Sequence, residues 1–188
     1  IKKSLAKEGR ICVVVSAMGN TTNSLIGLAN SVSDNPPPRE LDMLMSCGER
    51  SSMALLAMAL HDIGVRAISL TGSQSGIITD NNHSGAQIKE IKPSRVLEAF
   101  LTHQVVIIAG FQGISFDKEI TTLRRGGSDT TAVAMAAALN ALACEIYTDV
   151  AGIMDVDPKI VERAQLLPHI SFAHMEAMAL YGARVLAH

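Results

Sequence analysis

The stretch TTLRRGGSDTT, residues 121–131, stands between a strand pattern and an alanine-rich helix pattern. Gly126 and Gly127 let backbone N–H groups come close to a ligand, and Ser128 and Asp129 are residue types that often cap helix N-termini. The helix dipole then offers partial positive charge to a phosphate or a carboxylate. The stretch therefore predicts an anion site on an α/β fold, and an ordinary glycine turn with a helix cap is the alternative.

The composition favours one globular domain. The sequence has 188 residues, of which 48% are hydrophobic, and a formal net charge of −2 with scattered basic residues. These values argue against disorder and against a basic patch, so we expect no nucleic-acid partner. No apolar stretch reaches the roughly 18 residues that span a bilayer, and the opening IKKSLAKEG is too charged for a signal peptide. We therefore expect a cytoplasmic protein with no membrane partner.

Several common ligand motifs are absent from the sequence. The six histidines show neither HxH nor HExxH spacing. We therefore expect no metal site built by the protein alone, and any metal should arrive with a ligand. Neither GxxxxGK[ST] nor GxGxxG occurs, so the P-loop and dinucleotide-binding interpretations lack their residues.

Three apolar runs predict buried parallel strands, at residues 11–15 (ICVVV), 105–109 (VVIIA) and 144–148 (CEIYT). Helix patterns precede the second and the third run, and this β-α-β spacing predicts a mainly parallel sheet with helices on both faces. We therefore predict a three-layer αβα sandwich, with residues 11–15 in the centre of the sheet. Residues 76–79 and 87–91 are shorter strand candidates that fit an added hairpin.

Residues 65–70 are a further predicted strand. Polar loops that contain glycine follow this strand and the three apolar runs, at residues 16–22, 71–74, 110–113 and 148–152. In parallel sheets of this kind, ligands bind beyond the carboxyl ends of the strands. We therefore expect these loops to meet the glycine stretch at one site.

Six motifs carry a resemblance that covers nearly the whole chain. They are VVVSAMGNTTNSL (13–25), RELDMLMSCGER (39–50), TGSQSGIIT (71–79), AGFQG (109–113), TTLRRGGSDTTAVAMAAAL (121–139) and EIYTDVAGI (145–153). In sequence and spacing they resemble the catalytic domain of the aspartate kinases, within the amino acid kinase family. The resemblance implies the amino acid kinase fold, with residues 1–188 as a partial catalytic domain.

The resemblance also implies the reaction, which is transfer of the γ-phosphoryl of Mg-ATP to the β-carboxylate of L-aspartate. The product, 4-phospho-L-aspartate, begins lysine, threonine and methionine biosynthesis. The implied amino-acid site consists of Thr22, Glu49, Phe111, Arg125, Ser128 and Asp129, with Arg125, Asp129 and Glu49 as catalytic residues. Arg125 would hold the α-carboxylate, and Glu49 or Asp129 would receive the α-ammonium. Thr22 and Ser128 would orient the reacting carboxylate.

On the nucleotide side, the resemblance implies a set of residues that bind ATP, with Mg²⁺ arriving on the nucleotide. They are Ser16, Gly19, Thr148, Asp149, Met154, Lys159 and Arg184. Taken without the resemblance, Asp149 is a turn residue, Glu49 a charge on a helix surface and Phe111 a core aromatic.

The chain departs from the family pattern at both ends and at single positions. The family begins with a strand whose lysine contacts the transferred phosphoryl, whereas this sequence starts at Ile1, in what resembles the following helix. The regulatory ACT domains do not follow residue 188. Met154, Lys159 and Arg184 stand where the family commonly has Tyr, Arg and Lys. We therefore expect a fold truncated at the N-terminus, impaired in catalysis as this fragment, from a full-length protein that forms a homo-oligomer.

Arg124 replaces a family glycine and leaves two interpretations open: a strained backbone conformation meant for glycine, or an added charge beside the phosphates. Two rival functions also stay open. One is a kinase whose acceptor is a different carboxylate. The other is a catalytically inactive fragment or subunit that binds an amino acid or a nucleotide.

Overall fold

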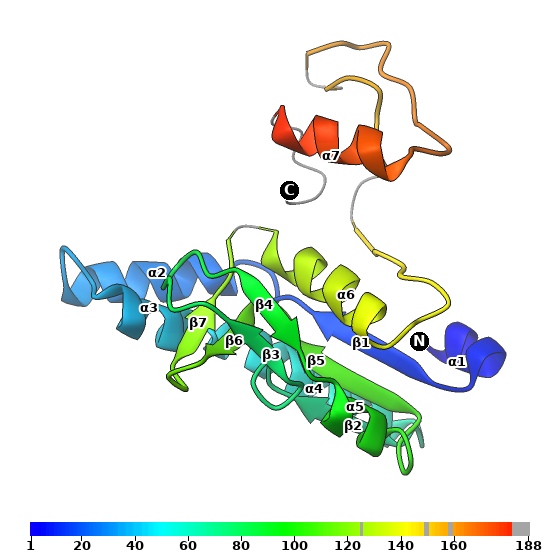
Figure 1. Ribbon diagram of the computed structural model, residues 1–188, viewed down its shortest axis with the longest axis horizontal. Helices are drawn as coiled ribbons and strands as arrows, with labels where there is room; N and C mark the ends of the chain where they lie inside the picture. The colour runs from blue at the N-terminus through cyan, green and yellow to red at the C-terminus, as the bar shows by residue number, and fades with distance from the viewer. Residues whose placement is uncertain (125, 149–150, 158–159, 182–188) are drawn as a thin grey trace. The chain divides into compact units, whose positions relative to one another are not determined.

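Figure 1 shows the computed structural model, which describes residues 1–124, 126–148, 151–157 and 160–181, apart from the side chain of Glu8. The chain divides into two compact units, Ile1–Ala143 and Cys144–His188. Within these described ranges, every helix is too short or too polar to cross a lipid bilayer.

The centre of the first unit is a three-stranded parallel sheet in the order β1-β5-β2. Its strands are β1 (Ile11–Val15), β5 (Val105–Ala109) and β2 (Ala67–Leu70). All five residues of β5 are buried, whereas those of β1 are half-buried. The predicted central position of residues 11–15 is therefore wrong. Both runs are β-branched and apolar, and hydrophobicity does not report which of two such strands has neighbours on both edges.

Helices cover both faces of this sheet. The odd-numbered residues of β5 pack in one core with apolar side chains of α4 (Cys47–Asp62). The even-numbered residues point to the opposite face and pack in a second core with α5 (Ser94–Ala99) and α6 (Gly127–Ala138). The result is the three-layer αβα arrangement that the sequence predicts, with α6 running along the sheet (Figure 1).

A second sheet of the same unit has the order β4-β3-β6-β7. Its strands are β4 (Ile88–Ile91), β3 (Ile77–Thr79), β6 (Gln112–Ser115) and β7 (Ile120–Thr122). Strands β3 and β4 are antiparallel, which confirms the added hairpin. Strand β7 pairs with β6 and leads directly into the glycine stretch before α6. This sheet therefore places the described part of the glycine stretch, residues 121–124 and 126–131, close to the end of β5.

Three further helices complete the first unit. Helix α1 (Lys2–Glu8) precedes β1, and α2 (Thr21–Val32) follows it. Helix α3 (Pro38–Met45) ends at Ser46, where α4 begins. This boundary puts Glu49 in the first turn of α4, beside the loop that follows β1.

The second unit contains α7 (Phe172–Leu180), and Ser171 caps it by accepting a hydrogen bond from the N–H of His174 at 3.2 Å. Met154 and Leu166 form an antiparallel bridge. The predicted strand at 144–148 is wrong, because these residues are exposed and have no strand geometry. An apolar run shows only that a segment could pair, and this run lacks the unbroken β-branched character of β5.

Candidate active site

A cavity of about 430 Å³ opens in the first unit, where β1, β5 and β7 end. Helices α2, α3, α4 and α6 also contribute to its walls. Residues that the sequence assigned to ligand binding line it from four parts of the chain: Ser16, Thr22, Glu49, Phe111, Ser128 and Asp129. The loops after β1 and β5 therefore meet the glycine stretch at one cavity.

The glycine stretch takes its shape from two glycines with different tasks. Gly126 is the N-cap of α6 and has φ +83°, a left-handed conformation that favours glycine. Gly127 is buried, and a Cβ there would lie 2.8 Å from Cβ of Leu123 and 2.9 Å from Cδ2 of Phe111. The cap is therefore Gly126 and not Ser128 or Asp129, which lie in the first turn of α6 and line the cavity. The positive end of the helix dipole at this turn favours an anion.

The end of β5 is locked against the start of α6. Phe111 has φ +64°, which is uncommon for a residue other than glycine. Its N–H donates to Oγ1 of Thr131 at 3.2 Å, and this hydroxyl donates to the carbonyl of Gly127 at 2.7 Å. A Cβ on Gly110 would lie 2.9 Å from Oγ of Ser128. These contacts fix Phe111 as one wall of the cavity.

Glu49 is only 3% exposed although it carries a carboxylate. Its Oε1 accepts a hydrogen bond from the N–H of Ala17 at 3.2 Å. Its Oε2 is buried and has no hydrogen-bond partner among the described residues. Burial raises the pKa of Glu49, and hydrogen bonds from the N–H groups of Glu49 and Ala17 partly oppose this. A buried acceptor without a partner is costly, so the site lacks a donor that a cationic ligand could supply.

Asp129 places a second carboxylate on the same cavity. It is half-buried in the first turn of α6, and burial raises its pKa. The cavity thus combines two desolvated carboxylates with a helix N-terminus. One part of it attracts a cation and another part an anion, which suits a zwitterionic ligand.

Sequence reasoning missed Asp42, which is fully buried in α3 and bonded to His83, Ser84 and Thr122. Ser84 and Thr122 line the cavity. Asp42 and Glu49 lie on different helices, α3 and α4, so no helical spacing in the sequence relates the two carboxylates.

Arg124 does not carry the strain that one interpretation predicted. Positive φ at described residues other than glycine occurs at Ser84, Phe111, Lys118 and Asn140, and Arg124 is not among them. The loop turns at Gly126 instead. Arg124 is exposed, and its side chain lies beside Gly85, where a Cβ would be 3.7 Å from its Nε. It therefore adds a charge near the cavity rim.

Among the other predicted residues, Gly19 of the first unit does not line this cavity. Gly19 is exposed with φ +52° in the loop before α2. Thr148 is exposed in the second unit, and Met154 forms the bridge with Leu166. Four predicted residues lie outside the described ranges: Arg125, Asp149, Lys159 and Arg184.

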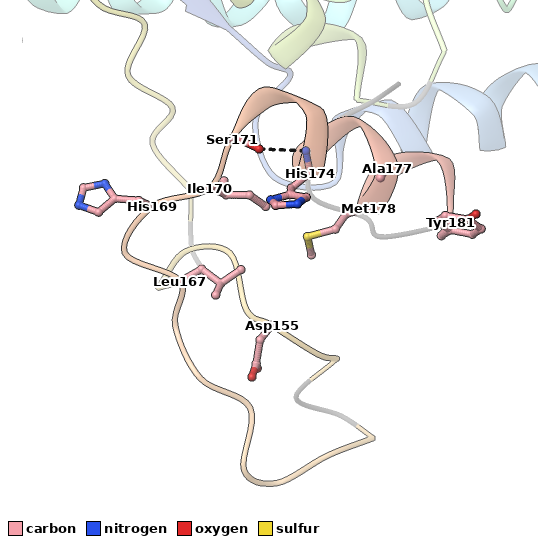
Figure 2. A pocket seen from close by; sticks show the side chains of 9 residues that line it. All are labelled: Asp155, Leu167, His169, Ile170, Ser171, His174, Ala177, Met178 and Tyr181. Carbon is pink, nitrogen blue, oxygen red and sulfur yellow. Dashed lines mark hydrogen bonds between the residues drawn. The ribbon is translucent and has the colours of Figure 1, made fainter.

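The second unit has a cavity of its own, of about 670 Å³. Figure 2 shows its lining, with His174 and Met178 on α7 and with Leu167 and Asp155 on the preceding loops. No group of three or more His, Cys, Asp or Glu residues that could hold a metal occurs in the described part of the chain.

Comparison with known proteins places the chain in a family. A sequence model of the amino acid kinase family matches residues 1–188. An aspartokinase from Mycolicibacterium smegmatis is 56% identical over 177 residues, which cover 94% of this chain and 42% of that protein. The chain thus spans less than half the length of the curated relatives it matches.

Solved structures agree with this assignment. The aspartate kinase from Synechocystis matches with a TM-score of 0.81 and 50% identity, over 98% of this chain and 31% of that one. The complex of E. coli aspartokinase III with aspartate and ADP matches with a TM-score of 0.76 and 31% identity, over 89% and 38% of the two chains. By sequence and by fold, the chain belongs to the amino acid kinase family.

Proposed function

We propose that this chain carries the acceptor site of an aspartate kinase, which transfers the γ-phosphoryl of ATP to the β-carboxylate of L-aspartate. The observation that carries the proposal is Glu49, which lines the same cavity as the N-terminal turn of α6 and whose buried Oε2 has no partner among the described residues. An amino acid supplies an ammonium group for the Glu49 carboxylate and a carboxylate for the N-terminal turn of α6.

The residues that we assign to the acceptor site then have separate roles in holding aspartate. Glu49 and Asp129 accept hydrogen bonds from the α-ammonium, and Arg125 holds the α-carboxylate in a bidentate pair. Thr22 and Ser128 orient the β-carboxylate, and Phe111 closes one wall against water. The N–H groups at the start of α6 stabilise negative charge as the phosphoryl moves. Support comes from the E. coli relative, whose structure was solved with aspartate and ADP.

ATP is the proposed phosphoryl donor, held by Ser16, Gly19, Thr148, Asp149, Met154, Lys159 and Arg184. Mg²⁺ would come with the nucleotide phosphates, as it does in many kinase sites. The family match runs without a break over residues 1–188, which supports one catalytic domain containing both units. We expect the natural protein to form a homo-oligomer, as the resemblance implies.

A coupled assay for ADP release tests the proposal, using the natural protein that contains this chain with ATP and Mg²⁺. ADP release that requires L-aspartate is the expected result. A thermal-shift series with aspartate, ADP and UMP adds a binding readout, since a bound ligand stabilises by RT ln(1 + [L]/Kd). Aspartate-independent release, or stabilisation by UMP in place of aspartate, would overturn the assignment.

A further inference from the structure

Asp42 of α3 is a fully buried carboxylate that joins three segments of the chain. Its oxygens accept hydrogen bonds from the N–H of Ser84 at 3.0 Å, from the hydroxyl of Ser84 at 3.3 Å and from the hydroxyl of Thr122. Nδ1 of His83 lies 2.8 Å from Oδ2 of Asp42. A carboxylate with so many donors is held firmly, and it fixes the orientation of each donor in turn.

Two of these donors, Ser84 and Thr122, line the cavity. Ser84 has φ +60°, in the left-handed region that residues other than glycine rarely adopt. Its N–H and its hydroxyl both bond to Asp42. Asp42 therefore holds the backbone of the 80–86 loop in a conformation that Ser84 would not favour alone.

A hydroxyl has one proton to donate and two lone pairs that accept. Ser84 and Thr122 each give their proton to Asp42, so neither hydroxyl has a proton left to donate to a ligand. Glu49 lines the same cavity, and its buried Oε2 is an acceptor without a partner among the described residues. An ammonium group has three donors and no acceptor, and it is the substrate group that suits such a wall.

We propose that Asp42 is a positioning residue, which holds the hydroxyls of Ser84 and Thr122 as hydrogen-bond acceptors and so makes the cavity select a substrate with a protonated amino group. This inference rests on the proposed function and deepens it, because it adds a discrimination step to the acceptor site. Aspartate is accepted, and a dicarboxylate of the same length without the amino group, such as succinate, is rejected.

The variants Asp42→Asn and Thr122→Val test the proposal. The side-chain NH₂ of asparagine would donate to one of the hydroxyls, which would then turn its own proton toward the cavity. Valine at 122 keeps the shape and removes the acceptor. Asp80→Asn is the matched control: Asp80 belongs to the same loop, accepts from the N–H of Gln87 at 3.1 Å and pairs with Lys89 at 3.1 Å, and it does not line the cavity.

The measurement is the ratio of the succinate Kd to the aspartate Kd, obtained by calorimetry on the natural protein that contains this chain, with the ADP Kd recorded alongside. Each test variant should lower the ratio by about tenfold, the usual effect of one hydrogen bond to a charged group. The control should leave it unchanged.

If the variants weaken the binding of aspartate and of succinate by the same factor, Asp42 only stabilises the fold. That result would overturn this inference and leave the proposed function intact. A wild-type ratio near one would overturn both. If Asp42→Asn does not fold, Thr122→Val decides. An unchanged ratio of the succinate Kd to the aspartate Kd in that variant would show that the Thr122 hydroxyl takes no part in substrate selection, and it would overturn the inference.

Discussion

The main-chain N–H of Ala17 donates a 3.2 Å hydrogen bond to Oε1 of Glu49, and this bond ties the loop after β1 to the first turn of α4. One oxygen of the carboxylate thus bonds to the backbone, whereas the other, Oε2, is buried without a partner among the described residues. A group in this state costs stability until a donor arrives. The buried carboxylate therefore destabilises the ligand-free protein, and a cationic ligand that donates to it would remove this cost.

Glu49→Gln should weaken aspartate binding by about 30-fold, or about 2 kcal/mol, because hydrogen bonds to a charged group are stronger than neutral ones. The glutamine oxygen can still accept from Ala17, so the loop should stay in place. Calorimetric titration with aspartate and with ADP measures the effect, and ADP binding should not change. Glu40→Gln, at an exposed site in the first turn of α3, is the control. Equal losses for aspartate and ADP would contradict the role of Glu49.

The raised pKa of Glu49 predicts a specific pH dependence for the ligand-free protein. Burial raises the folded-state pKa above the ordinary value near 4.5, so the folded state holds this proton at a pH where the unfolded state has lost it. Stability contributed by Glu49 therefore falls as pH rises from about 4.5 through the folded pKa, and it stays low above that. Glu49→Gln should remove this part of the dependence and raise the melting temperature at neutral pH.

Urea unfolding of the wild type and of Glu49→Gln at a series of pH values above 4.5 checks this. The two curves of unfolding free energy should converge on acidification. Asp129, whose pKa burial also raises, contributes in the same direction to both proteins and therefore cancels in the difference. Parallel curves would mean that the Glu49 carboxyl is not desolvated.

The sequence predicted the strands that local composition controls. The run VVIIA became β5 residue for residue, because five apolar and mostly β-branched residues can be buried on both faces of a sheet. The loops after β1 and β5 do meet the glycine stretch, as parallel topology predicts. The 71–74 loop does not line the cavity, and residues 148–152 belong to the second unit. The strand order and the irregular structure of residues 144–148 could not be predicted, because both depend on which strand edges pair in the folded protein.

The site could be predicted only in part, for a related reason. Residues such as Ser128 and Asp129 stand in a motif that signals its function locally. The partners of Asp42 are 41 to 80 positions away, so no local pattern reveals them. An isolated acidic residue on a helix is usually exposed, and only the fold shows that this one is fully buried.

Arg124→Gly should not raise the melting temperature, because Arg124 already has an unstrained φ. Glycine at an ordinary backbone position increases the entropy of the unfolded chain, and this should lower the unfolding free energy by about 0.5 to 1 kcal/mol. Differential scanning calorimetry of the two proteins is sufficient. A clear rise would mean that the loop before Gly126 is strained after all.

Gly127→Ala should destabilise the protein and weaken aspartate binding together. The added Cβ would lie 2.8 Å from Cβ of Leu123 and 2.9 Å from Cδ2 of Phe111, so the side chain of Phe111 must move. Overpacking of this kind costs about 1 to 3 kcal/mol.

Gly27→Ala is the matched control, because Gly27 lies inside α2 with nothing within 4 Å of a Cβ. There the same change should stabilise the protein by about 0.5 to 1 kcal/mol, through the better helix propensity of alanine. Urea unfolding and aspartate titration of both variants decide the matter. Stabilisation by Gly127→Ala would show that the contact between Phe111 and the start of α6 is loose, and the cavity wall would then lose its fixed position.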